Sequence, residues 1–321
     1  MTDPGATRRF ERAVVTGGAG FVGAHLCALL LEEDTEVIAV DNLVTSSADT
    51  PDALRRHERF RFVRHDVTRP IPLEDRADVV FHLASAASPR DYLALPLETL
   101  RAGSYGTEHA LELARRDSAR FVLASTSEVY GDPLEHPQRE RYWGNVNPIG
   151  PRSVYDEAKR YAEALTSAYR REHGVDTAIA RIFNTYGPGM RANDGRMIPA
   201  FLGQALGNEP ITVTGTGEQT RSICYVEDTV RGLLDLARSP HPGPVNIGNP
   251  HELTVRQVAE RIKEITGSGS AIESIDAVVD DPRRRCPDIS LARELLGWEP
   301  KIDPDDGLRR TAAWFRRAPS P

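Results

Sequence analysis

Short apolar segments alternate with longer amphipathic segments along the first half of the chain. Continuous apolar runs between helices are typical of a parallel sheet covered on both faces. The sequence therefore predicts an α/β fold with a doubly wound parallel sheet. The expected strands are 13–16, 36–40, 61–65, 78–83, 120–125 and 176–183, and the expected helices end near 31 or span about 97–116 and 153–173. Ser153 is the expected N-cap of the last helix, and Gly174 follows its end.

The second half of the chain is less regular. Proline, glycine and asparagine gather between residues 132 and 151, which predicts a long functional or mobile loop. Beyond Asn184 the alternation becomes irregular, and we expect a smaller C-terminal lobe that closes over the sheet. We assign residues 1–183, with about 222–247, to the sheet domain, and about 184–221 and 248–321 to the lobe.

Composition narrows the choice of partner and compartment. The 321 residues carry 40 Lys plus Arg against 47 Asp plus Glu, a formal charge of −7. This balance argues against nucleic acid, and no apolar run approaches the roughly 18 residues of a membrane span. Cys27, Cys224 and Cys286 are widely spaced, so we expect neither disulfides nor a metal site. A cytoplasmic, reducing location is expected.

A glycine-rich segment follows the first strand and opens the first helix. In a dinucleotide fingerprint, Gly17 would allow a tight turn, Gly20 would let backbone N–H groups approach a pyrophosphate, and Gly23 would let helix and strand pack closely. Alone, the glycines could form only a flexible turn. Asp41, however, ends the second strand, where its carboxylate can accept both ribose hydroxyls. Since no arginine stands at 42–45 for a 2′-phosphate, we expect a Rossmann-type site for NAD rather than NADP.

More cofactor contacts are expected where other strands end. Phe21 and Val22 start the helix after the glycine loop, and the third and fourth strands end in polar or small residues. Simple capping of the strand ends is the alternative. The predicted contacts at strand ends are Asn42, Asp66, Val67, Leu83, Ala84 and Ser85.

Tyr155 and Lys159 lie four residues apart on a predicted helix, so their side chains share a face. A free tyrosine has a pKa near 10 and is a poor base. We expect the Lys159 ammonium and a nicotinamide cation to lower the pKa of Tyr155, so that it can take a proton as a neighbouring carbon loses hydride. Thr126 and Glu128 leave a central strand toward the same crevice, although a buried Glu128 could simply pair with an arginine.

These motifs resemble the extended short-chain dehydrogenase/reductase (SDR) family of nucleotide-sugar enzymes. Longer segments resemble the UDP-glucuronate decarboxylases (UDP-xylose synthases) within it: STSEVYGDP at 125–133, YWGNVNPIG at 142–150, YDEAK at 155–159, RIFNTYGP at 181–188, QTR at 219–221, VNIGNP at 245–250 and DDPRRRCPD at 280–288. The resemblance implies an NAD-dependent carboxy-lyase whose smaller lobe binds the UDP-sugar. It also implies a homodimer with a four-helix interface.

The resemblance also implies roles for single residues. Tyr155 would be the base and then the acid at the sugar O4, assisted by Thr126, while Lys159 would hold the nicotinamide ribose. Ser127 and Glu128 would lie near C5, and Arg285 would orient the carboxylate. Because an ionised Glu128 would repel the substrate's acid, we expect either screening by Arg285 or partial protonation. Further expected contacts are Thr185 to the cofactor, and Asn184, Arg221, Tyr225, Asn246 and Arg285 to the sugar nucleotide.

A few positions depart from the family's pattern. Gly103 replaces a usual asparagine, which puts the local cofactor geometry in doubt. Gly189 replaces a common arginine, for which Arg191 is a candidate substitute. Arg101 and Cys286 each replace a usual lysine.

Three other functions compete with decarboxylation. A nucleotide-sugar 4-epimerase would need Tyr155, Lys159 and NAD, but not Glu128 with Arg285. A 4,6-dehydratase would have an Asp-Glu pair after the threonine, whereas Ser127 stands at the Asp position. A non-catalytic NAD-sensing scaffold has no need of Tyr155 and Lys159. UDP-glucuronate turnover with release of CO₂ would distinguish the four.

Overall fold

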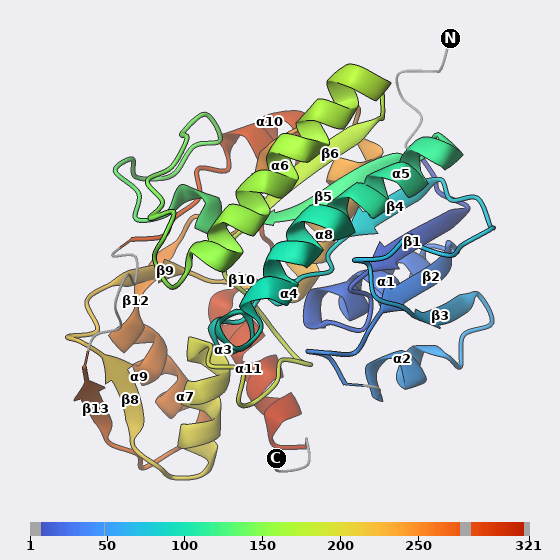
Figure 1. Ribbon diagram of the computed structural model, residues 1–321. Helices are drawn as coiled ribbons and strands as arrows, with labels where there is room; N and C mark the ends of the chain where they lie inside the picture. Colours follow the sequence, from blue (N-terminus) through green and yellow to red (C-terminus); the bar gives the residue numbers. More distant parts are fainter. Residues whose placement is uncertain (1–7, 48, 277–283, 318–321) are drawn as a thin grey trace.

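A seven-stranded parallel sheet forms the centre of the molecule, with the strand order β11-β6-β5-β4-β1-β2-β3 (Figure 1). This order confirms the predicted doubly wound topology. The computed structural model describes residues 8–47, 49–276 and 284–317. The sheet strands are β1 (Arg12–Thr16), β2 (Glu36–Asp41), β3 (Phe60–Arg64), β4 (Val79–His82), β5 (Arg120–Thr126), β6 (Thr177–Ile182) and β11 (Val245–Ile247).

Helices cover both faces of the sheet because its strands are apolar on both sides. Val15 of β1 packs in one buried cluster with helices α1 and α8, while Val14 packs in another with α5 and α6. The sheet is therefore the middle of three layers. The helices of this part are α1 (Phe21–Glu32), α2 (Asp49–Leu54), α3 (Pro89–Ala94), α4 (Pro96–Arg101), the π-helical η1 (Ala102–Gly106), α5 (Thr107–Asp117), the 3₁₀ turn η2 (Ser127–Tyr130), α6 (Ser153–His173) and α8 (Val226–Arg238).

A separate apolar core holds the smaller lobe together. The lobe contributes the pair β8–β13, drawn at the lower left of Figure 1 beside α7 and α9. Two short strand pairs, β7–β10 and β9–β12, complete the topology. The remaining elements are β7 (Thr185–Tyr186), α7 (Met197–Leu206), β8 (Ile211–Thr214), β9 (Thr220–Ser222), β10 (Cys224–Tyr225), β12 (Glu252–Thr254), α9 (Val255–Thr266), β13 (Ile272–Ile275), α10 (Ser290–Leu296) and α11 (Pro304–Phe315).

Three details differ from the expected pattern. The helix predicted at 97–116 is divided by the π turn η1. Helix α6 spans the predicted residues and ends at a left-handed Gly174, but its N-cap is Arg152 rather than Ser153, and no side chain caps it. Ala292 and Trp298, assigned to the lobe, pack in the core of the sheet. The division into domains stays a prediction.

None of the helices within residues 8–47, 49–276 and 284–317 is long and apolar enough to cross a membrane. In the same ranges, no three His, Cys, Asp or Glu side chains are grouped so as to hold a metal ion.

Candidate active site

The carboxyl ends of β1, β2, β4 and β5 bring the predicted cofactor and catalytic residues to one edge of the sheet. The glycine loop there has no room for side chains. Gly17 has φ +72°, and a Cβ on it would lie 2.8 Å from the Ala84 nitrogen. A Cβ on Gly23 would lie 2.1 Å from the Gly17 oxygen. Helix α1 begins at Phe21 after an N-cap at Gly20, so its free N–H groups face this loop.

Asp41 joins the ends of β1 and β2. Its Oδ2 accepts the N–H of Ala19 at 3.1 Å, and its Oδ1 accepts the N–H of Leu43 at 2.8 Å. The carboxylate thus lies against the glycine loop, where a ribose hydroxyl would reach it.

Other predicted cofactor residues line the same edge. Asp66 is hydrogen-bonded to Asn42, and the N–H of Leu83 donates to the Thr16 oxygen at 3.0 Å. Ser85 Oγ is buried and has no hydrogen-bond partner within the described structure. An orphaned hydroxyl next to a glycine cradle fits a polar ligand such as NAD. Thr185 Oγ1 donates to the Phe183 oxygen at 2.9 Å, and its contact with a cofactor stays a prediction.

Tyr155 is buried at the start of α6 and hydrogen-bonded to Thr126 at the end of β5. Burial raises the pKa of the phenol well above its ordinary value, and the Thr126 hydrogen bond offsets this only in part. The chain's own groups therefore leave the pKa of Tyr155 raised, and the expectation that Lys159 together with a nicotinamide cation lowers it stays a prediction. A nicotinamide cation would act in the opposite direction to burial.

Lys159 lies one turn further along the same face, with Nζ 5.9 Å from the centre of the Tyr155 ring. Nζ donates to the Ala124 oxygen at 2.8 Å, which fixes the ammonium at the end of β5. Burial lowers the pKa of Lys159 to about 8. The predicted pair is therefore brought together.

Glu128 in η2 is held by two arginines. Its Oε2 accepts from Arg152 Nη2 at 2.7 Å and from Arg285 Nη2 at 3.2 Å. Burial opposes ionisation, but the charges of Arg285 and Arg152 outweigh it, so the pKa of Glu128 is below its ordinary value. Glu128 is thus ionised and screened, not partly protonated. Arg285 also donates to the Ser127 oxygen at 2.6 Å.

Two residues of this site were missed by sequence reasoning. Arg152 precedes Tyr155 by three residues, so helical spacing alone could have placed it on the same side of α6. Asp156 is 7% exposed, and its Oδ1 has no hydrogen-bond partner within the described structure. Burial and the charge of Glu128 raise the pKa of Asp156 to about 7.

The predicted substrate residues divide into two groups. The expected role of Asn184 and Arg221 stays a prediction, but both keep suitable polar groups. Asn184 Nδ2 is buried with no partner in the described structure, and the Arg221 charge acts on both Glu128 and Arg285. Arg221 also donates to the Thr220 oxygen at 2.8 Å. An unsatisfied amide donor and a guanidinium suit phosphate oxygens.

Asn246 and Tyr225 are instead part of the protein's interior. Asn246 is 0% exposed, and its side chain accepts from Tyr130 Oη and donates to the Gln138 and Asp288 oxygens. Tyr225 is 3% exposed and packs in the core of the smaller lobe. The fold thus uses the Asn246 amide and the Tyr225 ring internally, and the expected contact of these two residues with the substrate stays a prediction.

The departures from the family's pattern have structural consequences. A Cβ on Gly103 would lie 2.7 Å from that of Ala158, so an asparagine does not fit between η1 and α6 as they pack here. Gly189 has φ +88°, and Arg191 pairs with Asp91 of α3. Cys286 is buried, with Sγ 3.3 Å from the Pro250 oxygen.

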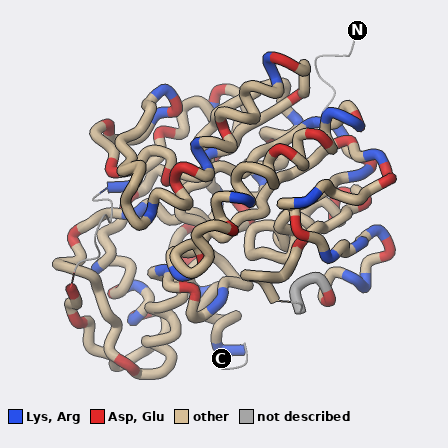
Figure 2. The backbone as a smooth tube through the Cα atoms, in the orientation of Figure 1, with Lys and Arg blue, Asp and Glu red and all other residues tan. Residues whose placement is uncertain are grey.

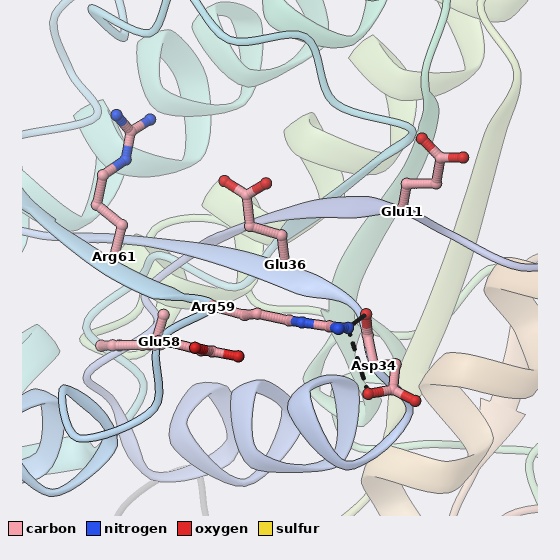
Figure 3. Close-up of a pocket in the computed structure, with 7 residues that line it drawn as sticks. Glu11, Asp34, Glu36, Glu58, Arg59 and Arg61 are labelled. Carbon is pink, nitrogen blue, oxygen red and sulfur yellow. Dashed lines mark hydrogen bonds and ion pairs between the residues drawn. The ribbon is translucent and has the colours of Figure 1, made fainter.

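A further pocket lies at the opposite, amino-terminal end of β1, β2 and β3 (Figure 3). Arg59 there bonds to Asp34, and the pocket contains none of the predicted site residues. Its lining is Glu11, Asp34, Glu36, Glu58, Arg59, Phe60 and Arg61. Open parallel sheets bind their ligands at the carboxyl ends of the strands, which lie at the opposite end from this pocket.

Comparison with known proteins agrees with this geometry. Residues 13–248 match the family model described as the NAD dependent epimerase/dehydratase family. UDP-glucuronic acid decarboxylase 6 of Arabidopsis thaliana is 52% identical over 306 residues, which are 95% of this chain and 89% of the relative. UDP-glucuronic acid decarboxylase 1 of Xenopus tropicalis is 49% identical over 307 residues, 96% of this chain and 72% of the relative.

Solved structures show the same fold. UDP-glucose 4-epimerase from Thermotoga maritima superimposes with a TM-score of 0.88 at 30% identity, covering 95% of this chain and 99% of that one. UDP-glucuronic acid 4-epimerase from Bacillus cereus, in complex with UDP-glucuronic acid and NAD, has a TM-score of 0.84 at 26% identity, with coverage of 95% and 99%. The sequence match, the glycine cradle and the Tyr155–Lys159 pair lead to one assignment. The chain belongs to the NAD-dependent epimerase/dehydratase family, the extended SDR family.

Proposed function

We propose that this enzyme converts UDP-glucuronate to UDP-xylose and CO₂ with tightly bound NAD. The observation that carries the proposal is the ionised Glu128 between Arg152 and Arg285, beside the Tyr155–Lys159 pair. Epimerisation at C4 breaks no bond at C5 and therefore does not require this second cluster of charges. The relatives at about 50% identity named UDP-glucuronic acid decarboxylases support the same choice.

The residues account for the proton transfers at C4. Tyr155 takes the O4 proton while C4 loses hydride, and the Thr126 hydroxyl orients the phenol. NAD, when bound, accepts the hydride and later returns it. Because burial raises the pKa of Tyr155, the enzyme needs the nicotinamide charge and Lys159 to reach the phenolate. Proton removal is thus coupled to cofactor binding.

The arginine cluster accounts for the chemistry at C5. A C4 ketone makes the sugar acid a β-keto acid. The bond between C5 and the carboxylate carbon can then break, which releases CO₂ and leaves an enolate. Arg285 presents a guanidinium that can orient the carboxylate, and Glu128 holds that guanidinium in place. C5 of the enolate then takes up a proton that comes from water, hydride returns to C4, and Tyr155 returns its proton to O4.

The test is turnover of UDP-glucuronate by the purified protein, followed by proton NMR and by trapping of CO₂. We expect CO₂ and a UDP-pentose in equal amounts. Tyr155→Phe should reduce the rate by at least about 100-fold, because the proton acceptor is lost. Formation of UDP-galacturonate without CO₂ would indicate an epimerase, and NAD binding without turnover would indicate a scaffold. Either result would reject decarboxylation.

We also propose a homodimer in the cytoplasm. Helix α6 packs against both α4 and η1, and each of the three leaves a large side chain exposed: Leu97 of α4 at 58%, Tyr105 of η1 at 55% and Tyr161 of α6 at 52%. Such a patch is typical of a subunit interface. The three cysteines are free and buried, which fits a reducing compartment. Analytical ultracentrifugation should give about twice the 35.4 kDa chain mass, and Tyr161→Glu should give the monomer.

A further inference from the structure

His82, the last residue of β4, takes part in a buried hydrogen-bond chain that the reaction above does not use. The ring is 2% exposed. Its Nδ1 lies 2.8 Å from Thr16 Oγ1 at the end of β1, and its Nε2 lies 3.2 Å from Thr107 Oγ1 at the start of α5. The imidazole therefore connects the strand that carries the glycine loop to the helix after the π turn.

The hydroxyl groups at both ends fix the direction of this chain. Thr107 Oγ1 donates to the Gly103 oxygen at 2.8 Å, so it can only accept from the imidazole. His82 must then carry its proton on Nε2 and accept at Nδ1 from Thr16. Thr16 Oγ1 in turn accepts the N–H of Ala84 at 3.4 Å. All four bonds run one way, from the Ala84 N–H to the Gly103 oxygen.

The surroundings keep the imidazole neutral and in place. It stacks on Phe121 with 6.1 Å between the ring centres. Burial and the charge of Lys159 lower the pKa of His82 to about 3. A proton on both ring nitrogens would reverse the bond from Thr16, so the chain exists only with the neutral ring.

Each end of the chain touches part of the cofactor site. At one end, Ala84 packs closely against Gly17: a Cβ added to Gly17 would lie 2.8 Å from the Ala84 nitrogen. At the other end, Gly103 packs against Ala158, the residue before Lys159. The hydrogen bonds therefore join the glycine loop to the part of α6 that carries the Lys159 ammonium.

We propose that His82 is a positioning residue, which through Thr16 and Thr107 fixes the distance between the glycine loop and Lys159 and so sets the affinity for NAD. It touches neither substrate nor reacting atoms. The inference rests on the NAD site of the proposed function and does not depend on decarboxylation.

The test compares three variants by calorimetric titration of NAD into protein stripped of nucleotide. Thr107→Val keeps the shape but leaves the His82 Nε2–H without an acceptor, and the Kd for NAD should rise about 5- to 10-fold. Thr107→Ser keeps the hydroxyl and should restore the parental Kd. Thr99→Val is the matched control, because Thr99 is equally buried and bonds to the Leu95 oxygen but has no histidine partner.

Two outcomes would overturn the proposal. Equal losses of thermal stability in Thr107→Val and Thr99→Val, with an unchanged Kd for NAD in both, would give His82 a purely structural role.

Two-bond ¹H–¹⁵N spectra supply an independent test, in which the His82 signals are identified by their loss in His82→Gln. They should show the Nε2–H tautomer without titration between pH 6 and 8, and a proton on Nδ1 or a pKa near 6.5 would contradict the chain. Since these measurements use NAD alone, a protein that binds NAD but releases no CO₂ would reject the proposed function and leave this inference intact.

Discussion

At the scale of single residues, two carboxyl groups that are both penalised by burial differ in charge state because their charged neighbours differ. Glu128 and Asp156 both lie in the same corner of the site, yet the pKa of Glu128 is lowered and that of Asp156 is raised to about 7. Two guanidinium groups bond to Glu128 directly, whereas Asp156 is penalised both by burial and by the charge of Glu128 itself. The site therefore holds one fixed carboxylate and one that titrates near neutral pH.

Replacement of Glu128 tests whether its charge serves the reaction. Glu128→Gln keeps the shape but leaves Arg285, which is 1% exposed, without its carboxylate. We expect kcat to fall by roughly 10²–10⁴-fold while the bound NAD content stays parental. Steady-state kinetics and nucleotide release from denatured protein measure the two quantities. Glu157→Gln, on α6, is the control. If Glu128→Gln turned over nearly as fast as this control, Glu128 would be excluded from the mechanism.

Asp156 should make stability depend on pH. An unfolded aspartate has a pKa near 3.9, so between about pH 4 and 7 the folded state holds the extra proton. The free energy of unfolding should therefore decrease as pH rises through this window. Asp156→Asn removes the penalty, and in urea unfolding it should be more stable than the parent by about 1–3 kcal/mol at pH 8 and less so at pH 5.5. The same difference at both pH values would show that titration is not the cause.

Sequence reasoning succeeded for residues whose spacing has a mechanical reason. The glycine loop and the Tyr155–Lys159 pair follow from turn geometry and the helical repeat. The burial of Tyr225 and Asn246 was not predicted, because a motif match does not show what a side chain packs against. His82 was missed because one polar residue within an apolar strand gives no signal of its hydrogen bonds.

At the scale of elements, the π turn η1 is the feature that the hydrophobic pattern did not predict. It lies directly between helices α4 and α5. One extra residue in a helical turn changes the pattern too little to detect. The structure gives the reason for Gly103: its backbone contacts Ala158 directly, so η1 and α6 approach more closely than side chains would permit.

A methyl group at this contact should separate the two helices. In Gly103→Ala the new Cβ would lie 2.7 Å from the Ala158 Cβ and 2.8 Å from the Ala158 oxygen. We expect a loss of about 1–3 kcal/mol in the free energy of unfolding, measured in urea. Adding Ala158→Gly removes the first clash and should recover part of the loss. If the double variant were as unstable as the sum of the single ones, the contact would not be the cause.

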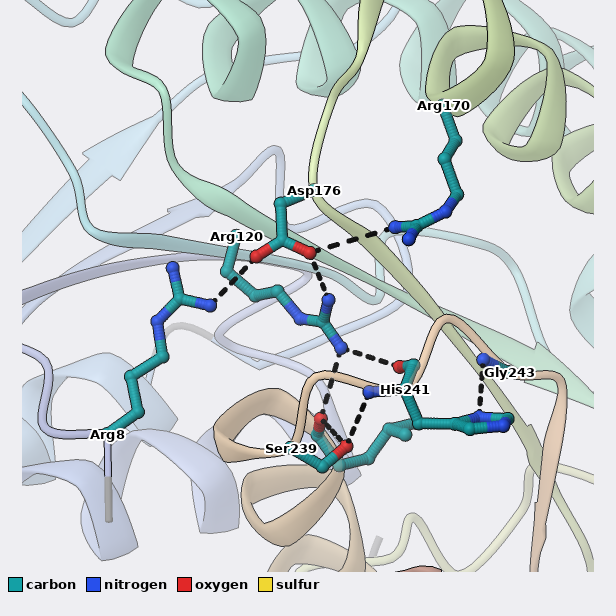
Figure 4. Close-up of polar contacts among 8 residues, drawn as sticks. Arg8, Arg120, Arg170, Asp176, Ser239, His241 and Gly243 are labelled. Carbon is teal, nitrogen blue, oxygen red and sulfur yellow. Dashed lines mark hydrogen bonds and ion pairs between the residues drawn. The ribbon is translucent and has the colours of Figure 1, made fainter. Parts of the chain in front are cut away.

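At the scale of the whole molecule, opposite charges are interspersed along the chain (Figure 2), and one partly exposed cluster of charges joins distant segments. Asp176, before β6, accepts from Arg8 at 2.8 Å, from Arg120 at the start of β5, and lies 3.8 Å from Arg170 of α6 (Figure 4). Arg120 is 0% exposed and also donates to the His241 oxygen. Alternating strands and helices predicted the sheet, but no local pattern could predict this cluster, because its members are up to 168 residues apart.

Asp176→Asn should weaken this end of the sheet without affecting the active site at the other end. The buried Arg120 would lose its carboxylate, and since Asp176 is 42% exposed we expect a cost of about 1–3 kcal/mol, less than for a fully enclosed pair. Arg170→Gln, with its longer contact, should cost under about 0.5 kcal/mol.

Burial opposes ionisation of Asp176, but the hydrogen bonds and charges of Arg8 and Arg120 keep its pKa below the ordinary value. The stabilisation is therefore complete above about pH 4 and is lost as pH falls through the lowered pKa, so the variant's deficit should shrink in acid. Urea unfolding at pH 7 and pH 3.5, with kcat per folded molecule, measures both effects. A deficit that stays constant with pH, or a changed kcat, would contradict a purely electrostatic link remote from the site.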